Sequence, residues 1–276
     1  YLRTIDDVDS IREEMKDRET MVIVGGGYIG LEVASVAIKQ GLKVSLLEME
    51  ERILQRVTTP EMSSFYHELH SEQGVHIRTS TQVTAFQGAD AVEKVICAGE
   101  DIPADIVIVG IGIIPNTEIA ETADLDIENG ISVNEKCMTS DQHIFAAGDC
   151  TNHPNPILNR RLRLESVPNA MEQSRVAASN MLGAGKIYSS IPWFWSDQYE
   201  HKLQMVGFSN ESEHAVIRGE MSSKTFTIFY LQNKKVIAAD SVNSPKDFLA
   251  SKQLIGKEIS PESLANQEIE LKTLIS

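Results

Sequence analysis

The sequence is poor in cysteine, in basic residues and in long apolar runs. It has 3 cysteines in 276 residues. No two of them form a Cys-x-x-Cys pair, so nothing supports a disulfide framework, a structural zinc site or a redox disulfide of that spacing, and we expect a reducing, cytoplasmic setting. Lys and Arg number 25 against 40 Asp and Glu. The resulting charge of −15 argues against general binding to nucleic acid or to anionic membranes. The longest apolar run, residues 106–114, falls far short of the ~20 residues that span a bilayer.

What the chain does contain is typical of a globular protein with a substantial core. Hydrophobic residues make up 42% and charged residues 24% of the sequence. The length predicts about two domains. Because the sequence begins with Tyr1, we expect it to be a piece of a longer protein.

Apolar periodicity predicts an alternation of strands and helices, which is typical of an α/β fold. Thr4 and Asp7 form a capping-box pair at the start of an amphipathic helix. Further helices are expected over residues 28–40, from Pro60 to about Gly74, and over residues 168–182. Strands are expected over residues 21–24, 43–48, 75–99, 105–112 and 143–149. After the Gly-rich residues 183–186 come aromatic strands and a helical tail, which we interpret as an α+β domain.

The clearest motif is GGGYIG, in which Gly25, Gly27 and Gly30 have the spacing GxGxxG. The motif follows an apolar strand and opens a helix. In that setting the first glycine permits a tight turn, the second allows the backbone to approach a pyrophosphate, and the third allows close packing of helix and strand. We therefore predict a dinucleotide site.

Two acidic residues extend this prediction. Glu48 ends the next strand, 18 positions after Gly30, where a carboxylate can accept hydrogen bonds from the adenosine ribose. Its charge would repel a 2′-phosphate, so NADH is favoured over NADPH. Glu32 either faces the nicotinamide or is an ordinary acid of a helix N-terminus, and the pattern leaves both interpretations open.

A second signature, HIFAAGDC, is an apolar run that ends in Ala-Gly-Asp. In order along the chain, GGGYIGLE, VGIGIIPN, FAAGDC, ESVPNAMEQ and PWFWSDQ closely resemble the flavoprotein ferredoxin and rubredoxin reductases of the pyridine nucleotide-disulphide oxidoreductase superfamily. The resemblance covers essentially the whole chain. It implies a Rossmann-like NADH-binding domain at residues 1–108, a remnant of a second, FAD-binding dinucleotide fold at residues 109–184, and a C-terminal α+β reductase domain at residues 185–276.

The resemblance also implies roles for individual residues. Asp149 would bind the ribityl chain of FAD, the backbone of Val167 would face the flavin pyrimidine edge, and Trp195 would lie near the isoalloxazine ring. The NADH site would be lined by Gly25, Gly27, Gly30, Glu32, Glu48 and Gly112. Trp193 and Trp195 share one strand face, where two aromatic residues are more often core than cofactor contacts.

The implied activity is passage of electrons from NADH through FAD to a ferredoxin or rubredoxin. Members of the family begin with a further GxGxxG segment for FAD that this sequence lacks, so we expect the chain alone to bind NADH without acting as a reductase. A docking patch for the acidic partner is expected at Arg161, Arg163 and Arg175; the alternative interpretation is local pairing with the abundant acids.

Alternatives are a non-catalytic NADH-binding module and an apoptosis-inducing-factor-like flavoprotein. His67 and His70 have metal-ligand spacing on a helix, but no third ligand is indicated and no metal site is predicted.

Overall fold

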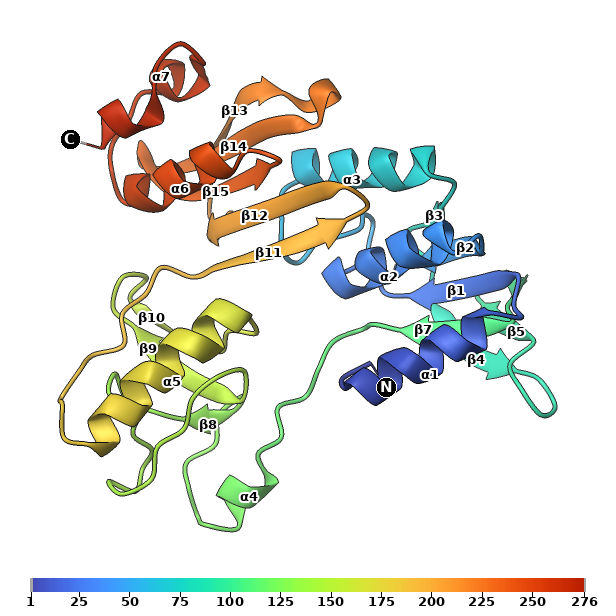
Figure 1. The fold of residues 1–276 in the computed structure, drawn as a ribbon, viewed down its shortest axis with the longest axis horizontal. Coiled ribbons are helices and arrows are strands. Elements are labelled where there is room, and N and C mark those ends of the chain that lie inside the picture. The colour runs from blue at the N-terminus through green and yellow to red at the C-terminus, as the bar shows by residue number, and fades with distance from the viewer. Residues whose placement is uncertain (1, 276) are drawn as a thin grey trace. The chain divides into compact units, whose positions relative to one another are not determined.

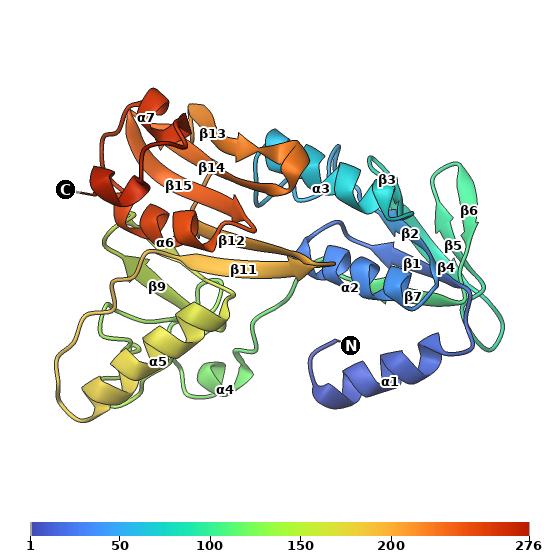
Figure 2. The ribbon, with the colours of Figure 1, turned by 45° about the horizontal axis from the view of Figure 1, so that its top comes forward.

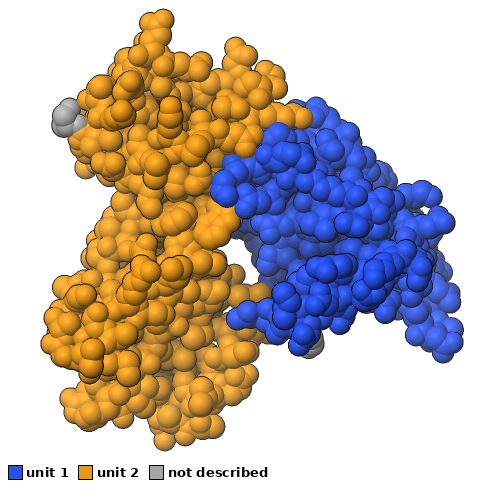
Figure 3. Space-filling model, in the orientation of Figure 1, with its two compact units in different colours: residues 1–112, 196–203 blue, residues 113–195, 204–276 orange. Residues whose placement is uncertain are grey.

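The computed structural model describes residues 2–275, whose contacts divide the chain into two compact units (Figure 3). Unit 1 holds the chain up to Gly112 together with residues Ser196–Leu203. Unit 2 holds residues Ile113–Trp195 and the chain from Gln204 onward. Among residues 2–275, no helix is both long and apolar enough to cross a membrane.

Unit 1 is built on a parallel four-stranded sheet (Figure 1). The strands stand in the order β3-β2-β1-β7. They are β1 (Thr20–Val24), β2 (Lys43–Leu47), β3 (His76–Arg78) and β7 (Ile106–Val109). The apolar run of β1 is buried on both faces because it lies at the centre of the sheet.

Two crossover helices connect the first three strands, α2 (Tyr28–Lys39) and α3 (Pro60–Glu72). Right-handed crossovers that run in one direction place both helices on the same face of the sheet. The apolar face predicted for α3 is buried, including Met62, Tyr66 and Leu69. The opposite face of the sheet is covered by the meander of β4 (Val83–Gln87), β5 (Lys94–Cys97) and β6 (Glu100–Pro103), whose Val95 and Ile102 pack in one core with Val22 and Leu47.

The opening helix α1 (Ile5–Met15) has the predicted capping box, because the Thr4 hydroxyl accepts from the Asp7 N–H while the Asp7 carboxylate accepts from the Thr4 N–H. Its apolar stripe is largely exposed, with only Met15 buried.

The first part of unit 2 joins one three-stranded sheet, in the order β10-β9-β8, to one long helix. It contains α4 (Glu118–Glu121), β8 (Ile131–Ser132), β9 (Thr151–Asn155), β10 (Arg160–Leu162) and α5 (Val167–Met181). Ala177 of α5 packs with Cys137 and Tyr188 in a small core, with Phe145 and Ala147 at its edge.

Two strand predictions need correction in this region. Residues 143–149 do not form a strand: Phe145 makes one isolated bridge to Met138, and the segment then turns at Gly148, whose φ is +91°. A strand needs a partner over its length, and among residues 2–275 this run has one at a single position. The strand predicted over residues 105–112 ends at Val109 and is half-buried rather than buried.

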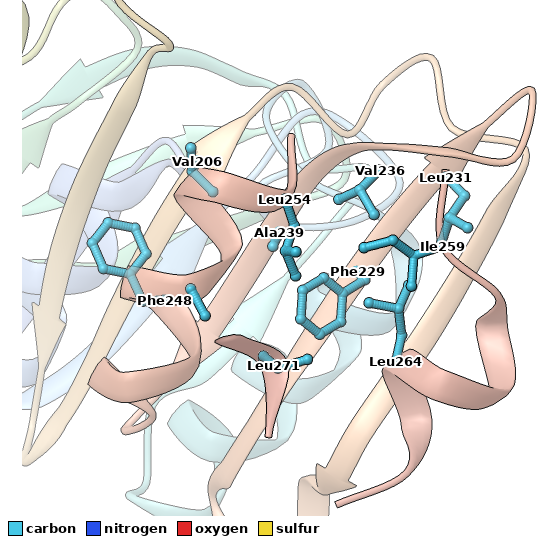
Figure 4. Close-up of a cluster of buried hydrophobic side chains, with 11 residues drawn as sticks. Val206, Phe229, Leu231, Val236, Ala239, Phe248, Leu254, Ile259, Leu264 and Leu271 are labelled. Atoms are coloured by element: carbon cyan, nitrogen blue, oxygen red, sulfur yellow. The ribbon is translucent and has the colours of Figure 1, made fainter. Parts of the chain in front are cut away.

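The C-terminal part of the chain forms a five-stranded sheet in the order β11-β12-β15-β14-β13 (Figure 2). The strands are β11 (Trp193–Gln198), β12 (His201–Gly207), β13 (His214–Glu220), β14 (Thr225–Gln232) and β15 (Lys235–Val242). The helical elements are η1 (Met221–Ser223), α6 (Pro245–Leu254), α7 (Pro261–Ala265) and η2 (Leu271–Leu274). Phe229 of β14 packs in a buried cluster with Phe248 and Leu254 of α6 and Leu264 of α7 (Figure 4).

A buried cation fixes the tail to this sheet. The Arg218 side chain is 8% exposed, pairs with Asp247, and donates to the carbonyls of Asn266 and Ile269.

The sheets and helices of both units confirm the predicted α/β fold with a C-terminal α+β domain. The predicted boundaries at 108/109 and 184/185 stay predictions.

Candidate nucleotide-binding site

The glycine loop between β1 and α2 is shaped by two close backbone contacts. A Cβ on Gly25, whose φ is +108°, would lie 2.3 Å from the carbonyl oxygen of Gly110. A Cβ on Gly30 would lie 2.1 Å from the carbonyl oxygen of Gly25. The first and third glycines of the motif thus allow the loop to lie directly against its neighbours, as the spacing predicts.

Gly27 has a different environment from these two glycines. It is the N-cap of α2, no side chain caps that helix, and a Cβ there would meet nothing within 4 Å. Space for an anion therefore lies beside a helix N-terminus, where backbone N–H groups and the helix dipole favour negative charge. Gly112, at the end of unit 1, also has open space around it and a φ of +131°.

The Glu48 carboxylate is joined to this loop. Its Oε2 accepts from the Gly26 N–H at 2.7 Å, and its Oε1 accepts from the Glu50 N–H at 2.9 Å. A Cβ on Gly26, the position that the GxGxxG pattern leaves unspecified, would lie 2.8 Å from Ile53 Cγ2 and 3.1 Å from Glu48 Oε2, so a side chain there would crowd both residues. The predicted ribose-binding acid and the predicted phosphate loop are therefore adjacent in space.

Glu32 is bound by a segment distant in sequence. The Ser196 hydroxyl of β11 donates to Glu32 Oε1 at 2.5 Å, and the Asp197 backbone N–H donates to the same carboxylate. Burial raises the pKa of Glu32, while these two donors oppose the rise. The sequence did not predict this contact, because the two residues are 164 positions apart.

His70 makes hydrogen bonds rather than forming part of a metal cluster. It is fully buried, its Nε2 lies 2.8 Å from Gln198 Oε1, and its Nδ1 lies 3.0 Å from the Tyr199 hydroxyl. Burial lowers its pKa to about 4, so the ring is neutral near pH 7. Among residues 2–275, no three His, Cys, Asp or Glu side chains are grouped to hold a metal ion.

In unit 2, the Ala-Gly-Asp turn is fixed by α5. Gln173 Oε1 accepts from the Gly148 N–H at 2.7 Å and from the Thr151 hydroxyl at 3.0 Å. Asp149 follows this anchored glycine and is exposed. The role of Gln173 was not singled out from the sequence, although the residue ends the ESVPNAMEQ motif.

Val167 and Trp195 lie on two further elements of unit 2. Val167 is the first residue of α5, next to the N-cap Ser166, whose hydroxyl accepts from the Asn169 N–H. Trp195 on β11 is 37% exposed, and its ring centroid lies 5.9 Å from that of Trp193. Trp193 packs onward against Phe248, so of the two tryptophans it is the one that belongs to the core.

The three arginines of the predicted docking patch differ in their partners and in their exposure. Arg161 donates to the carbonyls of Val133 and Asn152. Arg163 pairs with Glu165 at 2.6 Å and its side chain is only 12% exposed. Arg175 is exposed on α5.

Comparison with known proteins decides the family. Residues 1–174 match the pyridine nucleotide-disulphide oxidoreductase family, and residues 193–275 match the reductase C-terminal family. The chain belongs to the pyridine nucleotide-disulphide oxidoreductases. It is therefore an oxidoreductase of a family that uses FAD and NAD(H), which confirms the expected enzyme class and cofactors.

Two relatives and two solved structures illustrate the similarity. The chain is 45% identical to putidaredoxin reductase of Pseudomonas putida, covering 100% of this chain and 67% of the relative. It is 40% identical to rhodocoxin reductase of Rhodococcus erythropolis, over 100% of this chain and 66% of that relative. A ferredoxin reductase of Rhodopseudomonas palustris has a TM-score of 0.96 at 38% identity, covering 100% of this chain and 69% of that one. The reductase in a covalent putidaredoxin reductase–putidaredoxin complex has a TM-score of 0.95 at 45% identity, covering 100% of this chain and 67% of that one. The chain thus spans about two thirds of the relatives it matches.

Substituting the second and third glycines separately should separate folding from binding. We expect Gly30→Ala to lower the free energy of unfolding by about 2 kcal/mol or more, because its Cβ meets a backbone oxygen. Gly27→Ala should change that free energy by less than about 1 kcal/mol and weaken NADH binding at least tenfold, since its Cβ enters the space for the phosphates. Urea unfolding and calorimetric titration with NADH measure the two effects. Unchanged NADH affinity in Gly27→Ala would contradict this placement.

The buried His70 should make stability depend on pH. A pKa lowered from 6.5 to about 4 means that the unfolded chain binds the proton more readily than the folded one. The resulting stability is fully present above about pH 6.5 and is lost as pH falls toward 4, by about 3 kcal/mol at 1.36 kcal/mol per pH unit. We expect His70→Gln to flatten the urea-unfolding free energy over that range. Gln73→Ala, at the exposed C-cap of the same helix, removes no titrating group and is the control that should leave the slope unchanged.

Proposed function

We propose that this chain carries the NADH-binding part and a portion of the flavin site of a reductase that passes electrons from NADH through FAD to a ferredoxin or rubredoxin. The observation that carries the proposal is the contact of the glycine loop with Glu48, because it places a carboxylate suited to ribose hydroxyls beside the open space at the N-terminus of α2. Similar proteins bear the names putidaredoxin reductase and rubredoxin–NAD(+) reductase, which supports this choice of acceptor.

The residues of unit 1 fit NADH. The open side of Gly27 accepts the pyrophosphate, and Glu48 retains lone pairs for ribose hydroxyls after accepting from two backbone N–H groups. Glu32 lies on the helix that the loop opens, which supports a place at the nicotinamide end. Gly112 borders this unit and leaves room for a ligand.

The residues of unit 2 fit the sugar-like chain and the ring of FAD. Asp149 is exposed just after a turn that Gln173 holds, and a Cβ on Gly148 would lie 3.7 Å from Ala170 in the first turn of α5. Asp149 and the N-terminus of α5 with Val167 are therefore close together. That N-terminus suits the negative charge that a reduced flavin carries.

When bound, NADH and FAD supply the hydride and electron transfer itself. The protein residues bind and orient these groups, and no side chain is assigned as an acid, base or nucleophile. Cys137 is buried, which raises the pKa of its thiol to about 11, so it is a poor nucleophile at neutral pH. A cytoplasmic location stays a prediction from the cysteine count.

The function is tested with the full-length protein purified with its flavin, because we expect the 276 residues alone to bind NADH without reducing an acceptor. NADH is mixed with that protein and with either a [2Fe–2S] ferredoxin or a rubredoxin, and acceptor reduction is followed by absorbance. We expect NADH-dependent reduction of one of them. NADH binding without reduction of any acceptor would instead favour the non-catalytic NADH-binding module.

Glu48 should determine the choice between NADH and NADPH. Glu48→Gln keeps an acceptor for the Gly26 N–H but removes the charge, so it should bind NADPH more tightly while still binding NADH. Glu48→Arg should raise the ratio of NADPH to NADH affinity more than tenfold, because it also attracts the 2′-phosphate. Fluorescence titration of both variants measures the ratio. A wild-type chain that binds NADH and NADPH equally would show that Glu48 does not face the ribose.

We propose further that the acidic acceptor docks near Arg175, with Arg161 contributing. Arg175 is exposed, and Arg161 holds its charge beside β9 and β10 through carbonyl contacts that do not neutralise it. Arg163 contributes less, because Glu165 neutralises it and little of it is exposed. Positive charge around Arg175 can steer an acidic partner toward this surface, although the whole chain is acidic.

Charge reversal tests the docking surface. Arg175→Glu should slow reduction of the protein acceptor several-fold at low salt, with the difference shrinking as salt rises, and should leave reduction of ferricyanide unchanged. Lys43→Glu makes the same change at an exposed residue of unit 1 and is the control. Equal slowing of both acceptors by Arg175→Glu would place the effect at the flavin rather than at a docking surface.

A further inference from the structure

The turn between β11 and β12 belongs by its contacts to unit 1. Residues Ser196–Leu203 group with the parallel sheet of unit 1 and its helices rather than with the rest of the C-terminal strands. Glu200 at the turn pairs with Lys39 of α2 at 3.0 Å, and Tyr199 adopts a left-handed φ of +57°. The segment therefore contacts α2 through Ser196 and Glu200, and α3 through Gln198 and Tyr199, which both bind His70.

Four consecutive hydrogen bonds run through this turn. The Tyr199 hydroxyl lies 3.0 Å from His70 Nδ1, and His70 Nε2 lies 2.8 Å from Gln198 Oε1. Gln198 Nε2 lies 3.0 Å from the Ser196 hydroxyl, which lies 2.5 Å from Glu32 Oε1. The three middle side chains are at most 1% exposed.

The chemistry of the groups fixes the direction of the series. An amide oxygen only accepts, so His70 must carry its proton on Nε2 and accept from Tyr199 at Nδ1. The amide nitrogen of Gln198 only donates, so it occupies a lone pair of the Ser196 oxygen. The Ser196 proton is then left for the Glu32 carboxylate. Every donor in the series points toward Glu32.

This series orients groups and does not conduct protons. A carboxamide stands in the middle, and it does not readily accept a proton on one side and release one on the other. The neutral state of His70, with its pKa near 4, keeps a single tautomer at neutral pH. The result is a fixed hydroxyl donor aimed at one oxygen of Glu32.

We propose that Ser196, oriented by Gln198 and His70, is a positioning residue that holds the Glu32 carboxylate for the carboxamide N–H of the nicotinamide. The proposal rests on the proposed function of unit 1 as an NADH site. Glu48 takes the adenosine end of the dinucleotide, which leaves Glu32 as the carboxylate on α2 for the other end. Because Ser196 and the Asp197 N–H already hold the carboxylate in one orientation, NADH binding does not have to include the entropic cost of fixing it.

Ser196→Ala and Ser35→Ala form a matched pair for the test. Each deletes one buried hydroxyl that hydrogen-bonds Glu32, but Ser196 reaches the carboxylate while Ser35 donates to the backbone carbonyl at 2.8 Å. Three probes are titrated into each protein: NADH, its 3-acetylpyridine analogue, which lacks the carboxamide N–H, and ADP-ribose, which lacks the nicotinamide. We expect Ser196→Ala to weaken NADH binding about tenfold and to leave the other two probes within twofold of wild type. Ser35→Ala should change none of the three by more than twofold.

A second variant tests the upstream part of the series. Gln198→Glu replaces the amide by a carboxylate that accepts from both neighbours, so the Ser196 hydroxyl turns toward residue 198 and away from Glu32. It should reproduce the selective loss of NADH affinity, whereas Gln40→Glu, on the exposed end of α2, should not. Circular dichroism of each variant confirms that it is folded.

The outcomes separate the two proposals. If the wild-type chain binds neither NADH nor ADP-ribose, the proposed function fails. If it binds both, and Ser196→Ala weakens all three probes alike or weakens NADH no more than Ser35→Ala does, the positioning role is wrong. If Ser196→Ala is selective but Gln198→Glu is not, the role of Gln198 and His70 in orienting Ser196 is wrong.

Discussion

The contact of the glycine loop with its surroundings is the constraint on which the arrangement of unit 1 depends. The backbone of Gly25 touches Gly110 on one side and Gly30 on the other, at distances that exclude a Cβ. These contacts bring the N-terminus of α2 over the end of β1 and hold Gly26 where its N–H meets Glu48. A side chain at Gly25 or Gly30 would separate strand, loop and helix, and the space beside Gly27 would lose its shape.

The C-terminal part of the chain contributes to this unit as well. The turn between β11 and β12 carries Ser196, Gln198 and Tyr199 into contact with α2 and α3. The region that matches the reductase C-terminal family therefore supplies the Ser196 hydroxyl to Glu32, and the side chains of Gln198 and Tyr199 to His70. This arrangement links the two family regions through buried hydrogen bonds, which are costly to leave unsatisfied.

The arginines show that exposure and pairing, more than the density of basic residues in the sequence, decide which positive charges are available to a partner. Arg161 and Arg163 lie in the most basic stretch of the sequence, yet one donates to loop carbonyls and the other is neutralised by Glu165. Arg218, which stands alone in the sequence, binds the carbonyls of the tail and fixes α7 to β13. Arg175 keeps an exposed charge that an acidic partner can meet.

The sequence alone predicts the parts that depend on local spacing: the strand–glycine–helix unit, the apolar face of α3, the capping of α1 and the acid at the end of β2. These follow from periods and short-range geometry, which the order of residues contains. It failed over residues 143–149, because a strand also needs a partner that local pattern does not supply. Only the tertiary structure brought Ser196 to Glu32 and Gln198 to His70, since those pairs lie 164 and 128 positions apart. Hydrogen bonds between distant residues leave no periodic signal, so their partners are decided by how the chain folds back on itself.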